Sequence, residues 1–305
     1  MTIHTIAFIG IGNMGGPMAG HLARKGYQLA VFDLRRDLVE RFAAEHGARA
    51  ATSPADAANG ADAVITMLPN DKIVRAAILG ENGAASALRS GAVVIDMSTS
   101  DPSGTRTLAA DLAQRGIACV DAPVMGGVVF AKDATLDIMA GGEPAVVERC
   151  RPVLEALGRS VMLCGGIGTG HAMKALANYV NATALINAIE AMAVGAKFGL
   201  DPEFMAKALV PMCAGRNHPI EKKVLPHVLT RKYGTGMALG FIAKDVKIAH
   251  DMAVNSGAFA PLAEKVSALW SDAAEKVGAT VDQTEITRYW EAANDVSFRT
   301  VTRDS

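Results

Sequence analysis

Gly10-Ile11-Gly12-Asn13-Met14-Gly15 follows the apolar run Ile6–Ile9 and opens a segment of helical composition. A strand, a G-x-G-x-x-G turn and a helix in this order are typical of dinucleotide-binding folds. The glycines permit a tight turn, close approach of a pyrophosphate, and close packing of helix on strand. The pyrophosphate then lies at a helix N-terminus, where free N–H groups and the helix dipole favour an anion. We therefore predict that Gly10, Gly12, Asn13, Met14 and Gly15 form a cofactor loop.

A second apolar run, Leu29–Phe32, ends at Asp33, about 20 residues beyond the turn as this fingerprint expects. The Asp33 carboxylate is placed to accept hydrogen bonds from a ribose diol, which favours NAD. Arg35 and Arg36 follow and could instead bind the 2′-phosphate of NADP. The sequence predicts NAD, with NADP as the alternative. The competing interpretation of the loop is an ordinary glycine turn in another α/β protein.

The composition is that of a globular protein with little net charge. Half of the 305 residues are apolar, and 30 Lys and Arg against 31 Asp and Glu give a net charge of −1. Because there is no basic block, we expect neither nucleic acid nor an anionic membrane as a partner. The four cysteines show neither paired nor metal-ligand spacing, so we expect reduced thiols and no metal. No signal-peptide pattern and no apolar run of about 18 residues occur, and we expect a cytoplasmic protein.

The first half of the chain alternates short apolar runs with helical segments. This alternation is typical of parallel βαβ units with right-handed crossovers, and so predicts an α/β fold with a doubly wound, Rossmann-type sheet. Ligands of such sheets bind at the carboxyl ends of the strands. We assign residues 1–165 to this dinucleotide-binding domain. The expected strands are Ile6–Ile9, Leu29–Phe32, Ala63–Met67, Val93–Asp96, Ala118–Val120, Leu136–Ala140 and Ser160–Leu163, with helices including Arg35–Glu45, Lys72–Leu79 and Gly104–Gln114.

The second half changes character after Gly165–Gly170. The segment His171–Phe198 has no proline, one glycine and apolar residues on more than one face, which predicts a long helix buried on several sides. Asp201-Pro202-Glu203 then has the cap, proline and acid of a new helix start. We expect residues 166–305 to form an all-α domain joined by this long spine helix. Either the later helices cover the spine, or a second copy does so in a homodimer or homotetramer.

Lys174 and Asn178 stand four residues apart on the predicted spine helix and share one face of it. A lysine among apolar residues is costly to bury without a partner or a purpose. Burial lowers the pKa of a lysine and lets it take and give a proton near neutral pH. The equally good structural interpretation is a stem packed on apolar surface with its amine in solvent.

Four segments and a weaker fifth one form a characteristic set along the chain. The glycine turn continues into Gly16-Pro17-Met18-Ala19. The other three segments are Asp96–Pro102, Asp121–Gly127, and Gly168-Thr169-Gly170 with Lys174 and Asn178. The weaker fifth is Lys244-Asp245, near Phe241. Together they resemble the β-hydroxyacid dehydrogenase family, of the 3-hydroxyisobutyrate dehydrogenase type, over nearly the whole chain.

The resemblance implies hydride transfer between a nicotinamide cofactor and a small β-hydroxy acid. It implies that Lys174 moves the hydroxyl proton and that Asn178 orients both the lysine and the substrate. Gly126 and Gly127 would offer backbone N–H groups to the acid end of the substrate. The cofactor would also contact Leu68, Pro69 and Thr99 beside the nicotinamide ribose, and Lys244 on a helix closing over the site.

Met125 stands where the family usually has a serine that helps to hold the substrate carboxylate. A thioether offers no donor and is bulkier than a hydroxyl. Met125, Gly126, Gly127 and Asn178 remain the expected substrate contacts, but the acid pocket is altered. We therefore expect a substrate other than 3-hydroxyisobutyrate itself.

Arg216 and His218 lie in a region that supplies substrate contacts in the family. Arg216 could clamp an anion with two hydrogen bonds, or be a solvated surface arginine. His218 fits a hydrogen-bonded loop histidine better than a catalyst.

Two other functions fit the same residues. One is a reductase of tartronate, succinate or sulfonate semialdehyde, because the sequence does not fix the direction of the reaction. The other is a catalytically silent dinucleotide-binding scaffold. The presence of Lys174 on an apolar helix argues against the scaffold, since a scaffold has no reason to bury a lysine.

Overall fold

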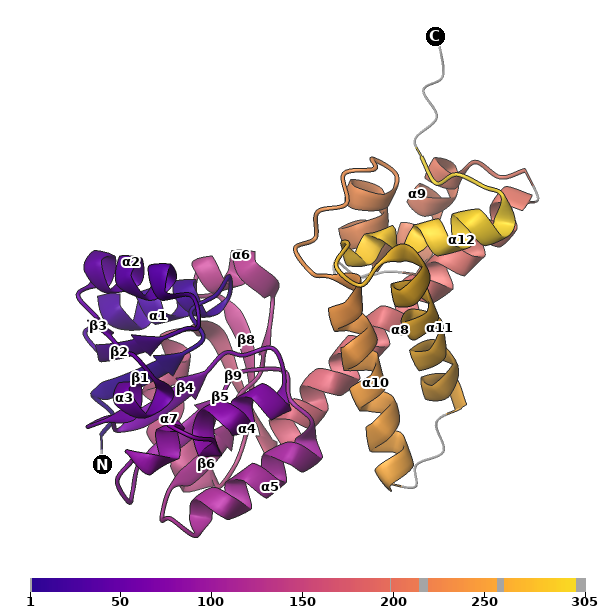
Figure 1. The fold of residues 1–305 in the computed structure, drawn as a ribbon. Helices are drawn as coiled ribbons and strands as arrows, with labels where there is room; N and C mark the ends of the chain where they lie inside the picture. The colour runs from indigo at the N-terminus through magenta and orange to yellow at the C-terminus, as the bar shows by residue number, and fades with distance from the viewer. Residues whose placement is uncertain (1, 198, 214–218, 257–260, 300–305) are drawn as a thin grey trace. The chain divides into compact units, whose positions relative to one another are not determined.

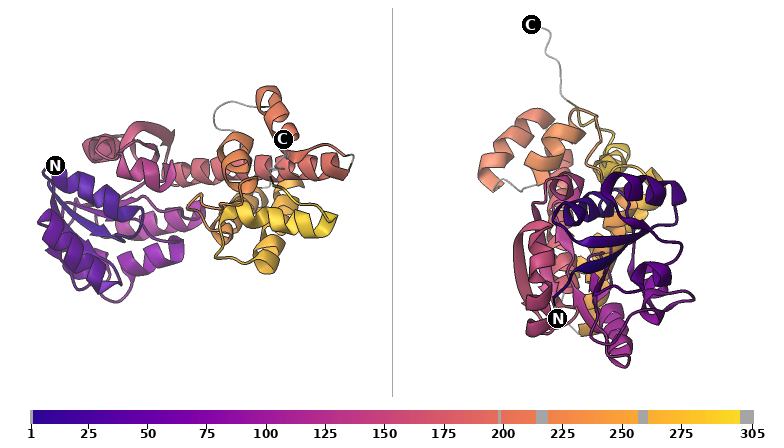
Figure 2. Two further views of the ribbon diagram at one scale, coloured as in Figure 1. Left: turned by 90° about the horizontal axis from the view of Figure 1, so that it is seen from above. Right: turned by 90° about the vertical axis from the view of Figure 1, so that its left-hand side faces the viewer.

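The computed structural model describes residues 2–197, 199–213, 219–256 and 261–299. The chain divides into two compact units, Met1–Lys174 and Ala175–Ser305, which we describe separately. The division between them falls inside one helix, α8 (Thr169–Lys197), which is a single continuous helix in Figure 2. The domain boundary after residue 165 stays a prediction.

The N-terminal unit contains a nine-stranded sheet with the order β3-β2-β1-β4-β5-β6-β8-β7, and β9 pairs with β8 (Figure 1). The neighbours from β3 to β6 are parallel, and this part is the doubly wound sheet that the sequence predicts. The strands are β1 Thr5–Ile9, β2 Gln28–Phe32, β3 Arg49–Ala50, β4 Ala63–Thr66, β5 Val93–Asp96, β6 Ala118–Asp121, β7 Val124–Met125, β8 Leu136–Gly141 and β9 Gly158–Gly165.

The expectation of parallel units throughout is wrong for β8, which runs antiparallel to both β6 and β7. The reversal arises because the chain after β6 turns back through β7 and a short helix instead of crossing over the sheet. The strands β3 and β7 are two residues long, too short to show a pattern in the sequence.

Helices cover both faces of the sheet, as Figure 1 shows for α1 and α2 on one side and α4 and α5 on the other. In β1, Ile6 and Phe8 pack with α1, α2 and α7, whereas Ala7 and Ile9 pack with α3, α4 and α5. This alternation follows from the two-residue period of a strand. The helices are α1 Gly15–Arg24, α2 Arg36–His46, α3 Pro54–Ala58, α4 Asp71–Leu79, α5 Pro102–Ala113, α6 Gly127–Lys132 and α7 Pro144–Glu155, with a 3₁₀ turn at Ala84–Ser86.

The C-terminal unit is helical in its described residues, as the sequence predicts. Its core surrounds the fully buried Trp270 and includes Leu185, Ile189 and Val246. Asp201 caps the helix that begins at Pro202, since its carboxylate accepts the Phe204 N–H at 2.8 Å. Beside α8, the elements are α9 Pro202–Cys213, the π-helix Ile220–Val228, α10 Leu239–Ser256, α11 Pro261–Val277, the 3₁₀ helix Gln283–Ile286 and α12 Thr287–Asn294.

Among the helices in the described part of the chain, none combines the length and the apolar character that crossing a bilayer requires.

Candidate active site

The glycine loop between β1 and α1 has no room for side chains at two of its positions. Gly10 has φ of +93°, and a Cβ there would lie 2.4 Å from the Met67 carbonyl oxygen. A Cβ on Gly15 would lie 1.9 Å from the Gly10 carbonyl oxygen. A Cβ on Gly12 would instead meet only an Arg35 nitrogen, at 3.4 Å. The tight turn and the open face at Gly12 fit a pyrophosphate at the start of α1.

Asp33 follows β2 and is oriented by this loop. Its Oδ2 accepts the Ile11 N–H at 3.1 Å, and its Oδ1 accepts the Arg35 N–H at 3.0 Å. The Arg35 guanidinium lies beside the carboxylate, with Nε 3.5 Å from Oδ1. Arg36 points elsewhere, toward Glu40 at 3.0 Å and the Ala51 carbonyl oxygen at 3.2 Å. Of the two arginines, Arg35 is therefore the one next to the cofactor loop.

A hydrogen bond connects the segments that follow β4 and β5, beside the same loop. The Leu68 N–H donates to Ser98 Oγ at 2.9 Å, and the Leu68 side chain would lie 2.8 Å from a Cβ on Gly10. Pro69 is the next residue and is exposed, while Thr99 is half-buried directly after Ser98. The structure thus places Leu68, Pro69 and Thr99 at the carboxyl edge of the sheet, just after β4, which pairs with β1, and β5, which pairs with β4.

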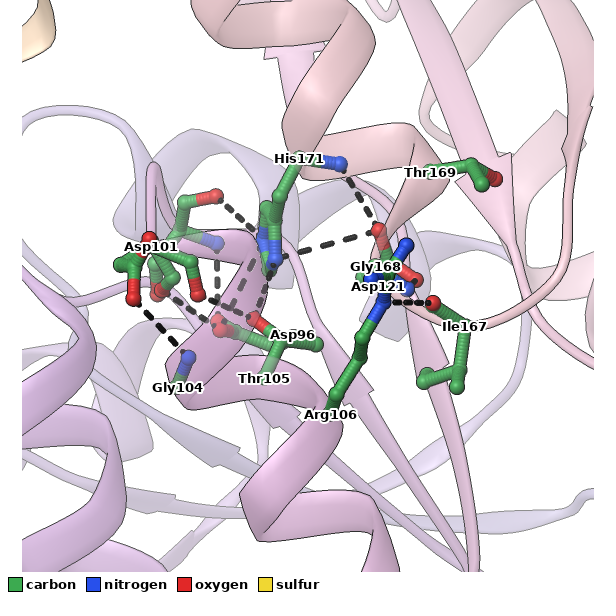
Figure 3. Close-up of polar contacts among 12 residues, drawn as sticks. Asp96, Asp101, Gly104, Thr105, Arg106, Asp121, Ile167, Gly168, Thr169 and His171 are labelled. Carbon is green, nitrogen blue, oxygen red and sulfur yellow. Dashed lines mark hydrogen bonds and ion pairs between the residues drawn. The ribbon is translucent and has the colours of Figure 1, made fainter. Parts of the chain in front are cut away.

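A buried polar cluster lies at the ends of β5 and β6 (Figure 3). Asp96, at the end of β5, accepts hydrogen bonds from the Thr66 and Ser100 hydroxyls, both at 2.8 Å. Asp121, at the end of β6, accepts the backbone N–H groups of Gly168 and His171, both at 2.7 Å. Burial raises the pKa of the Asp121 carboxyl above its usual range, although His171 and these N–H groups act in the opposite direction.

Sequence reasoning included Asp96 and Asp121 only as the first residues of two family-like segments, and gave no individual role to them or to His171. The available signal was a carboxylate at the end of a fully apolar strand. A charge in that position needs partners, which here come from segments distant in the chain.

Lys174 lies one turn after His171 on α8 and is 7% exposed, so its amine does not extend into solvent. Its Nζ lies 3.0 Å from Met125 Sδ. Gly126 and Gly127 follow Met125 with φ of +131° and +75°. A Cβ on Gly127 would meet no atom within 4 Å, so the backbone is open there. The structure therefore brings the predicted lysine and the predicted substrate segment together.

Asn178 and Lys244 meet through one carboxylate inside the C-terminal unit. Asn178 Nδ2 donates to Asp245 Oδ2 at 2.5 Å, and Lys244 Nζ lies 2.9 Å from Asp245 Oδ1. Asp245 is 3% exposed. Since a carboxylate only accepts hydrogen bonds, the bond fixes which end of the Asn178 amide faces Asp245. The amide oxygen is directed away from Asp245.

The structure does not describe some of the residues named in the sequence analysis. Arg216 and His218 lie outside the described residues, as does the side chain of Cys213.

Cys119, Cys150 and Cys164 are free thiols, and burial raises the pKa of Cys150 to about 12. In the described ranges, no group of three or more His, Cys, Asp or Glu residues is arranged to hold a metal ion.

Comparison with known proteins agrees with this geometry. Residues 5–166 match the model of the NAD-binding domain of 6-phosphogluconate dehydrogenase, and residues 168–290 match that of the NAD-binding region of NADP-dependent 3-hydroxyisobutyrate dehydrogenase. The chain is 36% identical to mouse mitochondrial 3-hydroxyisobutyrate dehydrogenase over 257 residues, 82% of this chain and 76% of the relative. The chain belongs to the β-hydroxyacid dehydrogenase family.

Other members of the β-hydroxyacid dehydrogenase family are similarly close. The chain is 36% identical to the NAD-dependent L-serine dehydrogenase of Pseudomonas aeruginosa over 271 residues, 87% of this chain and 90% of the relative. A structure of 3-hydroxyisobutyrate dehydrogenase from Mycobacterium tuberculosis with L-serine matches with a TM-score of 0.82 and 30% identity. It covers 95% of this chain and 99% of that one. The chain is accordingly a nicotinamide-dependent oxidoreductase that acts on a CH–OH group.

Proposed function

We propose that this dehydrogenase acts reversibly on a small β-hydroxy acid, with Lys174 as the proton-transfer residue. The observation that carries the proposal is the position of Lys174. Lys174 is a buried residue, and its Nζ lies 3.0 Å from Met125 Sδ, two residues before the open backbone at Gly127. A proton donor and acceptor next to an open glycine segment suits a substrate with a hydroxyl at one end and an acid at the other.

The cofactor loop would hold the pyrophosphate through backbone N–H groups of Gly12 to Gly15, and Asp33 would accept hydrogen bonds from the ribose diol. When bound, the nicotinamide supplies the hydride acceptor or donor. Leu68, Pro69 and Thr99 would line the ribose next to it, at the strand ends that Ser98 joins. NAD is the expected cofactor, and NADP is the alternative through Arg35.

The protein's own residues handle the proton and the acid. A neutral Lys174 amine would take the proton of the substrate hydroxyl during oxidation, and its ammonium would return the proton during reduction. Asn178, oriented by Asp245, would present its amide oxygen to the amine or hydroxyl. Gly126 and Gly127 would offer N–H groups to the carboxylate.

The substrates after which the relatives are named support a particular class of substrate. 3-Hydroxyisobutyrate and L-serine both carry a primary hydroxyl on the carbon next to the one that bears the carboxylate. They differ in having a methyl or an ammonium group on that middle carbon. We propose a substrate with this β-hydroxy acid frame, and Met125 would contact the part that varies. The corresponding semialdehyde would be the substrate in the reducing direction.

We also propose a homodimer or homotetramer. An apolar groove of about 670 Å³ lies between α8 and α11, lined by residues that include Tyr179, Val180, Leu262 and Leu269. Val180 and Leu262 are 64% and 60% exposed. Light scattering at micromolar concentration is expected to give at least a dimeric mass, and a monomer would refute this part. A cytoplasmic location stays a prediction.

Substitution of Lys174 tests the proposed function. Turnover would be measured with NAD and NADP on 3-hydroxyisobutyrate, L-serine and the corresponding semialdehydes. Lys174→Ala is expected to lower kcat by roughly two to four orders of magnitude, the range for a positioned acid–base group. Lys174→Arg should fail similarly, because arginine keeps the charge but does not release a proton. The control is the exposed Lys25→Ala. Retention of more than about a tenth of wild-type kcat in Lys174→Ala would refute the assignment.

A further inference from the structure

The His171 ring is completely buried in the N-terminal unit and is held through both nitrogens. Nδ1 lies 2.8 Å from the Thr105 hydroxyl on α5, and Nε2 lies 3.1 Å from the Ser98 carbonyl oxygen. A carbonyl only accepts, so Nε2 carries a proton and donates it to Ser98. The ring therefore has one fixed orientation.

Two carboxylates flank this ring (Figure 3). Asp96 Oδ2 lies 3.7 Å from Nε2, and Asp121 Oδ2 lies 3.8 Å from Nδ1. Asp121 also accepts the His171 backbone N–H at 2.7 Å. Asp121 thus holds the backbone of the first turn of α8, and Ser98 and Thr105 hold the His171 side chain of the same turn.

Each contact of His171 leads to a different part of the candidate site. Ser98 precedes Thr99, and its hydroxyl accepts the Leu68 N–H. Asp121 ends the strand that continues into the Met125–Gly127 segment. Lys174 is three residues after His171, so both side chains lie on the same face of α8. One buried ring therefore connects the strand ends assigned to the cofactor, the substrate segment and the lysine.

We propose that His171 is a positioning residue that fixes the rotation of the first turn of α8, and with it the place of the Lys174 amine. An amine at the end of a lysine lies roughly 8 Å from the helix axis, so a rotation of about 10° moves it by more than about 1 Å. Displacement by about 1 Å in a reacting constellation can lower a rate about a hundredfold. An apolar side chain could fill the same space, and a buried polar network is not needed for stability alone.

The inference rests on the proposed role of Lys174, and the experiment separates the two. His171→Ala is expected to lower kcat about 10- to 100-fold, the range for groups that orient a functional residue. The dissociation constant of NADH, measured by fluorescence, and the KM for the better of 3-hydroxyisobutyrate and L-serine should each change less than about threefold, because neither ligand contacts His171. Thr105→Val, which removes one hydroxyl, should lower kcat to a smaller extent.

His171→Gln should restore much of the activity. Its amide nitrogen can donate to the Ser98 oxygen, and its amide oxygen can accept from the Thr105 hydroxyl once that hydroxyl turns from the Asp101 carbonyl oxygen, 3.0 Å away. Val153→Ala is the control for lost stability, because Val153 is a buried α7 residue without a part in the site. It should lower the melting temperature but leave kcat of the folded enzyme unchanged.

Wild-type kcat in folded His171→Ala overturns the positioning role, as does an equal loss of kcat in His171→Ala and Val153→Ala. Failure of His171→Gln to exceed His171→Ala in kcat also overturns it. If Lys174→Ala keeps wild-type turnover, the proposed function fails instead, whatever the His171 variants do.

Discussion

Lys174 Nζ lies 3.0 Å from Met125 Sδ. A thioether is only a weak acceptor, so it does not compete strongly with a substrate hydroxyl for the amine. It does occupy space that a smaller polar side chain would leave to the substrate. The pair therefore places Met125, a predicted substrate contact, next to the group proposed to move the proton.

Met125→Ser should shift the substrate preference. A hydroxyl that donates to a carboxylate contributes about 1.5–3 kcal/mol, or roughly 10- to 150-fold in kcat/KM. The variant should gain on 3-hydroxyisobutyrate and lose on the substrate that the wild type prefers. The check is kcat/KM on 3-hydroxyisobutyrate, L-serine and longer β-hydroxy acids, with Met125→Leu as a control of similar volume. Unchanged preference, or 3-hydroxyisobutyrate already best in the wild type, would contradict the prediction.

The wild type should prefer NAD, and Asp33→Ala should move the preference toward NADP by about 10- to 150-fold, as for loss of hydrogen bonds to a charged group. Arg35→Ala should weaken use of NADP, because Arg35 lies beside the loop and Asp33. Arg36→Ala is the matched control, since Arg36 pairs with Glu40 instead. Specificity constants with both cofactors decide this, and a clear NADP preference in the wild type would refute it.

Asp245→Ala should lower kcat about 10- to 100-fold, because the Asn178 amide then loses the acceptor that orients it. Asp245→Asn should retain more activity, since its amide oxygen can still accept from Asn178 Nδ2. The control is Asp251→Ala, which removes an exposed carboxylate from the same helix. Equal activity of wild type and Asp245→Ala would show that Asn178 needs no such support.

The pH dependence of stability should report on Lys223. Burial lowers the pKa of Lys223 to about 8, from 10.5 for an unperturbed lysine. Between these values the unfolded state binds more protons, so the contribution of Lys223 to the free energy of unfolding rises with pH from about 8 to 10.5. Lys223→Met should remove this rise in urea unfolding experiments. The exposed Lys232→Met should keep it, and a rise that persists in Lys223→Met would have another source.

The sequence predicts the sheet well because each central strand is a run of apolar residues that ends in a glycine or a polar residue. Gly10 and Asp33 are also recognisable, since their chemistry is tied to their spacing along the chain. The roles of Asp245 and His171 are not recognisable in this way. Their hydrogen-bond partners Asn178, Thr105, Ser98 and Asp121 are 50 to 73 residues away in sequence, and the sequence does not show which polar residues are buried. The antiparallel direction of β8 is not predictable from the sequence either, because it is set by the path of the preceding loop.

The acceptor for the first N–H groups of α8 comes from β6, 47 residues before Gly168. A fragment that starts at residue 166 would lack this cap, and the turn before Lys174 would lose its anchor. The two halves of the chain are therefore poor modules for exchange. In a chimera with a foreign helical half joined at residue 165, the first turn of the foreign helix would have to fit Asp121. A junction after Lys174 would keep the native first turn together with its own sheet.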